Sequence, residues 1–144
     1  MTSHPTWRVA LPPVLAEQIS ALARAAHPAE CCGLLEGVRA GDVIGVAALH
    51  PVRNRAGQPD RFDMDPRDQF AAQKAARANG RAIIGCYHSH PDGEARPSAH
   101  DLAGAGEADF LWLIAAGDAL NAFVYRDGGF REVITGADWV TSSE

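Results

Sequence analysis

The stretch RAIIGCYHSHPDGEARPSAHD, residues 81–101, decides the fold, because its apolar beginning predicts a strand in the middle of a sheet. Gly80 precedes this strand, and Pro91, which cannot donate a ladder hydrogen bond, ends it. Successive strand residues point to opposite faces, so His88 and His90 share one face if the strand continues through both. Two imidazoles on one face, a strand repeat apart, can reach a single ion.

The residues on either side of this strand predict alternating strands and helices. Apolar spacing predicts a helix over residues 14–26. Proline in the first turn, alanines and glutamines within and Gly80 as the stop predict a second over residues 66–79, and a short helix is predicted over residues 98–106. Further strands are predicted over residues 6–11, 30–38, 43–49, 108–116, 119–126 and 128–134. Residues 50–65 carry Pro, Asn, Gly and charged residues and predict a long loop. This order indicates an α/β (α+β) single domain over residues 1–144, with a mixed β-sheet flanked by helices.

Composition narrows the range of functions. The chain has 144 residues, of which 47% are hydrophobic and 22% charged, as in an ordinary globular domain. Its formal net charge of -5 argues against nucleic acid as the main partner. We expect no membrane partner and a cytoplasmic location, because no apolar run approaches ~20 residues and no signal-peptide pattern opens the chain. Three cysteines, two of them adjacent, indicate reduced thiols rather than a disulfide framework.

Asp101 extends the histidine pair to a set of three potential metal ligands. It follows His90 by eleven residues, and a loop with one helical turn can return its carboxylate to the strand end. Two nitrogens and one oxygen are a ligand set that catalytic zinc uses when a fourth position holds water. Ser98 and Asp101 also fit a helix capping box, which is the ordinary interpretation of Ser-x-x-Asp. The spacing of all these residues together is specific, whereas His-x-His alone is weak.

The other half of the candidate site lies upstream. Glu30 begins an apolar strand, where a carboxylate is unusual, and it is our candidate for the base that a zinc hydrolase needs. The alternative is an ordinary residue at a strand end. Cys32 and Cys86 leave a second alternative open, a structural or redox zinc site with the histidines, although the usual close cysteine spacing is missing. We interpret both thiols as small core residues near the site.

Together, HPAECCGLLEG (residues 27–37) and GCYHSHPDGEARPSAHD (residues 85–101) resemble the signature of the JAMM (MPN-plus, JAB domain) zinc metalloproteases. The resemblance covers most of the chain and is strongest to short, stand-alone prokaryotic members, which commonly carry a segment similar to FDMDP (residues 62–66) before the second helix. It implies a cytidine-deaminase-like fold and a zinc-dependent peptidase or isopeptidase with one Zn²⁺ per chain. The motif is intact, which argues against the inactive, scaffold-only branch of the family.

The resemblance also implies a role for each residue of the motif. His88, His90 and Asp101 would bind zinc, Glu30 would be the general acid and base, and Ser98 would help hold the oxyanion. The hydrolysis would use a zinc-activated water, with Glu30 first accepting its proton and then returning it to the departing amine.

Family resemblance further implies the substrate class: a ubiquitin-like or sulfur-carrier protein joined through its C-terminal Gly-Gly tail. Such a tail is thin and could add as a strand to a sheet edge. We expect residues 53–61 and 91–96 to form the walls of its groove. Peptide and isopeptide bonds both fit, and the oligomeric state does not follow from the sequence. A non-catalytic module that binds a ubiquitin-like protein is the main alternative.

Overall fold

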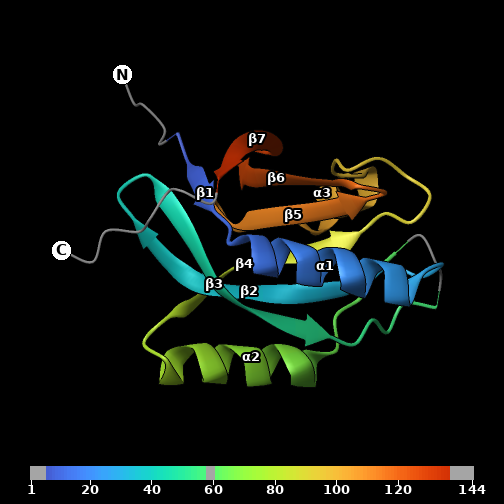
Figure 1. Cartoon of the computed structure of the whole chain (residues 1–144), viewed down its shortest axis with the longest axis horizontal. Coiled ribbons are helices and arrows are strands. Elements are labelled where there is room, and N and C mark those ends of the chain that lie inside the picture. Colours follow the sequence, from blue (N-terminus) through green and yellow to red (C-terminus); the bar gives the residue numbers. More distant parts are fainter. Residues whose placement is uncertain (1–5, 58–60, 137–144) are drawn as a thin grey trace.

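The computed structural model describes residues 6–57 and 61–136, in which seven strands and three helices are present (Figure 1). The strands are β1 (Arg8–Ala10), β2 (Cys32–Ala40), β3 (Val43–Val52), β4 (Ala82–Ser89), β5 (Leu111–Ala116), β6 (Ala119–Arg126) and β7 (Gly129–Gly136). The helices are α1 (Pro13–Ala26), α2 (Pro66–Ala78) and α3 (Ala99–Gly104). Each predicted strand and helix is therefore present. No helix in the described ranges is both long enough and apolar enough to span a membrane.

The strands form one mixed sheet in the order β1-β3-β2-β4-β5-β6-β7, and β1 also pairs with β7, which closes the sheet into a barrel. The pairs β1–β3, β1–β7 and β4–β5 are parallel, and the others are antiparallel. The predicted α+β class, with a mixed sheet flanked by helices, is confirmed. β4 lies between β2 and β5, as its apolar sequence predicted.

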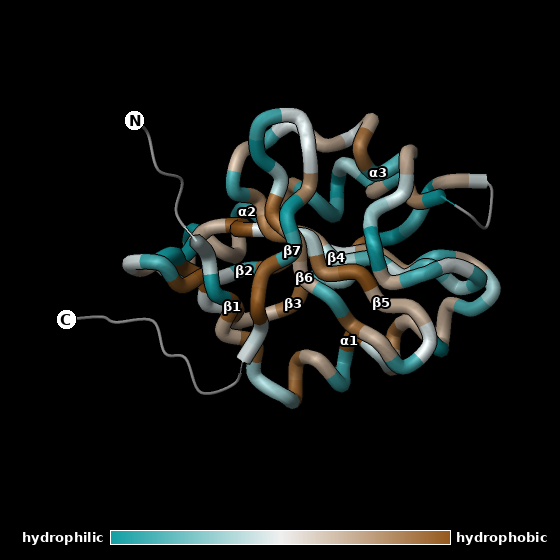
Figure 2. Tube along the Cα trace, turned by 90° about the horizontal axis from the view of Figure 1, so that it is seen from above, coloured by the Kyte–Doolittle hydropathy of each residue, from teal (hydrophilic) through white to brown (hydrophobic). Residues whose placement is uncertain are grey.

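Helices cover both faces of this sheet, so the central strands are apolar on both sides. Leu35 belongs to the core that packs against α1, whereas its neighbour Leu34 belongs to the core beneath α2. Figure 1 shows α1 and α2 on opposite sides of β2, and in Figure 2 the hydrophobic parts of the trace run along the strands in the middle of the molecule. Burial on both faces explains why these strands read as continuous apolar runs.

Two element boundaries bear on the site. β3 continues to Val52, two residues beyond the predicted start of the loop, because the antiparallel register pairs Val52 with Cys32. β4 ends at Ser89, one residue before His90. The His90 amide still donates to the Ala115 carbonyl (2.8 Å), so the backbone keeps its strand direction through both histidines.

Glu36 is the one fully buried carboxylate in the part of the chain that the structure describes, and it connects β2 to the end of α2. It accepts hydrogen bonds from His50 Nε2 (2.8 Å), Asn79 Nδ2 (3.1 Å) and Arg81 Nη1 (2.8 Å). Burial by itself raises the pKa of Glu36, but these hydrogen bonds outweigh it, so the pKa lies below its usual value. The ionised carboxylate therefore stabilises the folded state.

We expect Glu36→Gln to reduce the free energy of unfolding by roughly 1–3 kcal/mol near pH 5, because it removes the charge that three donors share. A depressed carboxyl pKa contributes stability above the unfolded pKa of about 4.3 and loses it as the pH falls through the folded value. The difference from wild type should therefore shrink at pH 3. Urea unfolding at both pH values measures it, and Glu132→Gln, at an exposed position of β7, is the matched control. A difference that stays constant with pH would contradict this role.

Candidate active site

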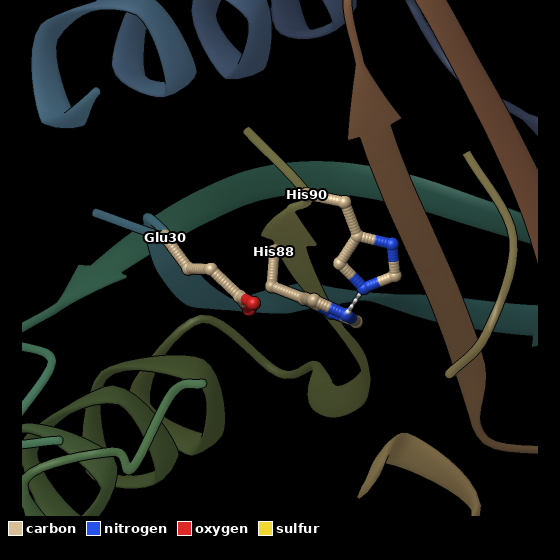
Figure 3. A group of neighbouring side chains, drawn as sticks. All are labelled: Glu30, His88 and His90. Atoms are coloured by element: carbon tan, nitrogen blue, oxygen red, sulfur yellow. Dashed lines mark hydrogen bonds between the residues drawn. The ribbon is translucent and has the colours of Figure 1, made fainter. Parts of the chain in front are cut away.

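The candidate site lies where β4 ends beside the start of β2 (Figure 3). The register pairs Cys32 with His88, and the Ser89 amide continues the pairing by donating to the Cys31 carbonyl (3.1 Å). Glu30, at the head of β2, is thereby brought level with the two histidines, although almost sixty residues separate them. Figure 3 shows the Glu30 carboxylate extended toward the His88 ring.

Three ligand atoms converge at this point. His88 Nε2 lies 3.0 Å from His90 Nε2 and 3.1 Å from Asp101 Oδ2, and the distance from His90 Nε2 to Asp101 Oδ2 is 3.2 Å. Glu30 also offers a carboxylate oxygen, and its ligand atom and those of the two histidines all lie within 4.8 Å of one another. The fold therefore brings together the residues that the sequence motif singled out.

The surroundings of His90 and Asp101 leave the converging atoms free to bind a cation. His90 Nδ1 lies 2.8 Å from the Glu94 carbonyl, which can only accept, so Nδ1 carries a proton and the neutral ring keeps its lone pair on Nε2. Burial lowers the pKa of His90, but the hydrogen bond to Asp101 outweighs it, so the pKa lies above its usual value and a metal ion would have to displace a proton from Nε2. Asp101 Oδ2 accepts the Ser98 amide (2.9 Å). Burial raises the pKa of Asp101, but its bonds to the histidines outweigh burial and keep the pKa well below its usual range.

His88 is fully buried and is held by aromatic packing rather than by a second hydrogen bond. Its ring stacks on Phe62 (centroids 4.4 Å apart) and meets the edge of Trp112 (5.9 Å). Its Nδ1 atom is buried and has no hydrogen-bond partner in the described structure. Burial lowers the pKa of His88 and so favours the neutral imidazole, the form that binds a metal. The sequence analysis did not assign this role to Phe62.

These residues fit a zinc ion. Tetrahedral zinc with bonds of about 2.0 Å separates neighbouring ligand atoms by roughly 3.3 Å, close to the spacing of the three converging atoms. A neutral His88, a His90 with its lone pair on Nε2 and an ionised Asp101 are the protonation states that binding requires. Three protein ligands leave a fourth position open, as in catalytic rather than structural zinc sites.

Ser98 is the N-cap of α3, and both bonds of a capping box are present. The Asp101 amide donates to Ser98 Oγ (3.0 Å), and the Ser98 amide donates to the Asp101 carboxylate. The capping interpretation is therefore confirmed. The capping bond leaves the Ser98 hydroxyl able to donate, because an oxygen that accepts one hydrogen bond can still donate its own proton.

A cavity of about 590 Å³ opens beside the site and is lined by Glu30, Arg61, His90, Ser98 and much of residues 91–100. Most of residues 91–96, which we predicted to form one wall of the substrate groove, line this cavity. Of the described residues of the other predicted wall, 53–57 and 61, only Arg61 lines the cavity. The Arg53 guanidinium binds the Asp68 carboxylate instead (2.9 Å). Residues 58–60 lie outside the described ranges.

The cysteines do not take part in the candidate site. Cys32 and Cys86 are buried in the core beneath α2, and the Cys32 thiol donates to the Val52 carbonyl (3.5 Å). Burial raises the pKa of Cys32 to about 12 and that of Cys86 well above its usual value, whereas metal binding requires the thiolate. Neither belongs to the described group of potential metal ligands. This arrangement favours the small core residues that we predicted.

Comparison with known proteins agrees with the fold and the motif. Residues 12–126 match the family of prokaryotic homologs of the JAB domain. The chain is 35% identical over 108 residues to a desampylase of Haloferax volcanii, across 74% of this chain and 76% of that protein. It is 30% identical over 103 residues to the CysO-cysteine peptidase of Mycobacterium bovis, across 71% of this chain and 68% of that protein.

A solved structure is also similar. The solution structure of protein DSY2949 from Desulfitobacterium hafniense superposes with a TM-score of 0.80 and 36% identity, covering 88% of this chain and 90% of that one. The family match spans most of the chain, and the resemblance first seen in residues 27–37 and 85–101 is confirmed. This chain therefore belongs to the prokaryotic JAB family, a branch of the JAMM/MPN proteins.

Proposed function

We propose that this protein is a zinc-dependent metallopeptidase that hydrolyses the bond after the C-terminal Gly-Gly tail of a ubiquitin-like or sulfur-carrier protein. The observation that carries this proposal is the convergence of His88, His90 and Asp101 with the Glu30 carboxylate beside them. The names of the relatives, a desampylase and a CysO-cysteine peptidase, support a hydrolase of this class. The proposal treats residues 1–144 as one metallopeptidase domain that acts in the cytoplasm.

His88, His90 and Asp101 would hold one zinc ion per chain, and Glu30 would not be a ligand. When bound, zinc supplies Lewis acidity, which lowers the pKa of water to about 7 and polarises a carbonyl. Glu30 accepts a proton from the attacking water and passes it to the departing amine. Glu30 is 5% exposed and lines the cavity, so it can reach substrate while bulk water is largely excluded from it.

Ser98 would donate its hydroxyl proton to the oxygen that becomes negative as the carbonyl is attacked. Its position supports this role, because Ser98 is an exposed residue at the cavity wall that also contains Glu30 and His90. The capping bond from the Asp101 amide holds Ser98 Oγ in place without consuming its proton. The Ser98 side chain thus caps α3 and would also contact the carbonyl oxygen that is attacked.

We expect Ser98→Ala to lower turnover about a hundredfold or more with zinc retained, because one oxyanion donor is lost. Loss of the cap should cost roughly 1 kcal/mol of stability at the same time. Ser98→Thr keeps both the cap and the hydroxyl and is the matched control. Steady-state rates beside thermal unfolding separate the two effects. If the Ser98→Ala protein is destabilised but turns over at the normal rate, Ser98 acts only as a helix cap.

The Gly-Gly tail would enter through the cavity beside Glu30. The sequence suggested that the tail adds to a sheet edge. β1 pairs with only Val43–Gly45 of β3, so the outer edge of β3 beyond Gly45 is not paired with another described strand and could accept the tail. Pairing with the segment 91–97 along the cavity wall is a second route for an extended tail.

A cleavage assay with defined conjugates tests the proposed function. The zinc-loaded protein is incubated with the ubiquitin-like and sulfur-carrier proteins of the same organism, each joined through its C-terminal glycine to a peptide amine or to a lysine side chain. Intact mass should show a carrier that ends in free Gly-Gly, and the two linkages distinguish peptidase from isopeptidase. Conjugates that bind the zinc-loaded protein but stay intact would favour the alternative, a non-catalytic binding module.

A further inference from the structure

We propose that Asn54 is a positioning residue for Glu30, which it aims by holding the Glu30 backbone against residues 53–57 and 61–65, the described parts of the loop between β3 and α2. This inference rests on the proposed function, since it assumes that Glu30 is the acid and base. It concerns the backbone of Glu30, whereas the motif specifies only its side chain. Asn54 itself would not touch substrate.

The side chain of Asn54 makes four hydrogen bonds. Its Nδ2 group donates to the carbonyls of Glu30 and Arg61 (3.0 Å each), and its Oδ1 accepts the amides of Ala56 and Asp63 (2.9 Å each). Carbonyls only accept and amides only donate, so these partners define the orientation of the side-chain amide. Both donors and both lone pairs are used, a pattern that aspartate, which has no donor when ionised, cannot reproduce.

Glu30 lies two residues before Cys32, where β2 begins, so the Asn54 bond holds its carbonyl beyond the end of the strand. Ser89, between the two histidines, holds the other side of the same peptide and the peptide after it: the Cys31 amide donates to Ser89 Oγ (2.9 Å), and the Ser89 amide donates to the Cys31 carbonyl (3.1 Å). Ser89 thus ties the segment to the metal-binding strand, and Asn54 ties the carbonyl of Glu30 to the loop. The backbone that carries the proposed base is held by two different elements.

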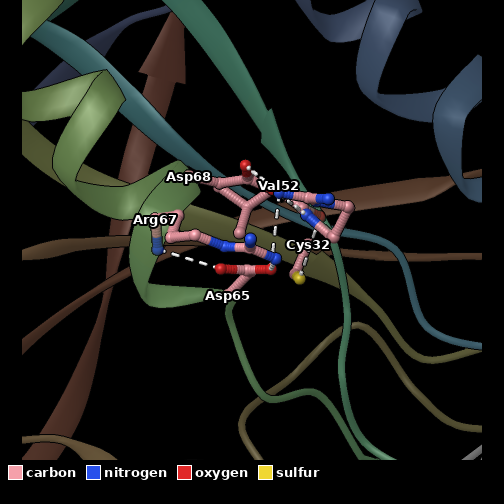
Figure 4. Close-up of polar contacts among 6 residues, drawn as sticks. Cys32, Val52, Asp65, Arg67 and Asp68 are labelled. Carbon is pink, nitrogen blue, oxygen red and sulfur yellow. Dashed lines mark hydrogen bonds and ion pairs between the residues drawn. The ribbon is translucent and has the colours of Figure 1, made fainter.

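The described parts of this loop are firmly attached, so they can serve as a reference for Glu30. Arg53 binds the Asp68 carboxylate through two guanidinium bonds of 2.9 Å each, and the Asp65 amide donates to the Arg53 carbonyl (3.0 Å). Within the loop, the Arg55 amide donates to the Asp63 carbonyl (2.7 Å). Figure 4 shows Asp65 and Asp68 at the start of α2, gathered near the end of β3. Asn54 therefore connects Glu30 to the N-terminus of α2.

The expected effect follows from the sensitivity of catalysis to geometry, because a misplacement of about 1 Å can cost on the order of a hundredfold in rate. We expect Asn54→Ala and Asn54→Asp to lower kcat by roughly 10–100-fold, with KM changed less than about threefold and zinc content unchanged. In the Glu30→Gln background the same substitutions should change kcat by less than about twofold, because misplacing a base that is already absent costs nothing.

Asn79→Ala is the matched control. It also removes an asparagine that donates to a glutamate, Glu36, but at the far end of α2. Its kcat should stay at the wild-type value. If Asn54→Ala or Asn54→Asp does not fold, Asn54→Ser retains a shorter donor and should show a smaller loss of the same kind.

The double mutant gives the decisive comparison. The proposal would be overturned if the Asn54 substitution lowered kcat equally with and without Glu30. It would also be overturned if the substitution changed KM alone. Either result would mean that Asn54 acts on the loop and on substrate binding instead of on Glu30. A crystal structure of the folded Asn54 variant gives a second readout that needs no turnover: the Glu30 carboxylate should move relative to the His88 and His90 rings. An unmoved carboxylate refutes the positioning role. Absence of cleavage by wild type would instead refute the proposed function.

Discussion

His88→Ala is expected to yield a folded protein that contains almost no zinc and shows no cleavage above background. The three converging atoms are separated by spacings that suit one ion, and removing one leaves two ligands where catalytic zinc needs three. Asp101→Asn should have a similar effect while keeping the size of the side chain, because the amide carries no negative charge. The wild-type protein should contain one zinc per chain.

Elemental analysis of chelator-free protein, beside the cleavage rate, measures both outcomes. His100→Ala is the matched control for zinc content, since His100 is an exposed neighbour of Asp101 and lies outside the converging group. Cys32→Ser and Cys86→Ser address the structural zinc alternative, and both should keep the metal. Unchanged zinc in His88→Ala, or zinc lost from the cysteine variants, would show that the ion is bound elsewhere.

Glu30→Gln is expected to keep zinc and fold normally, yet to lose at least the ~100–10,000-fold that general acid–base catalysis contributes. Glutamine has the same shape and still forms hydrogen bonds, but it cannot accept a proton. Substrate binding should survive, so the variant should retain the Gly-Gly-tailed partner uncleaved. Single-turnover rates, zinc content and co-purification with the conjugate measure the three properties separately.

Glu30 lies close enough to the histidines to be a metal ligand itself, so Glu30→Gln also tests whether Glu30 belongs to the ligand set. Loss of zinc from Glu30→Gln would place Glu30 in the ligand set and contradict the assignment of three ligands. A normal rate would mean that another group accepts the proton. Glu107→Gln, an exposed carboxylate between α3 and β5, is the control for a change of charge alone.

Local pattern alone predicted most of the architecture, because each element carries its own signal. The apolar run that became β4 is buried on both faces, and α2 begins at Pro66, where the Asp65 side chain accepts the Arg67 amide, as helix starts commonly do. Residues of the motif were identifiable because they lie close in sequence: His88, His90 and Asp101 span one strand end, a loop and one helical turn. The role of Glu30 needed the family resemblance.

Only the tertiary structure decided how distant segments of the chain meet. Closure of the sheet by β1 and β7, the stacking of Phe62 on His88, and the hold of Asn54 on the Glu30 carbonyl join parts of the chain that no local rule connects. Periodicity reports which face of a segment is buried, and not what buries it. The sequence by itself therefore determined the elements and the motif of candidate metal ligands. The folded chain determined how those elements close and what aims the proposed base, because these depend on contacts made only once distant strands have paired.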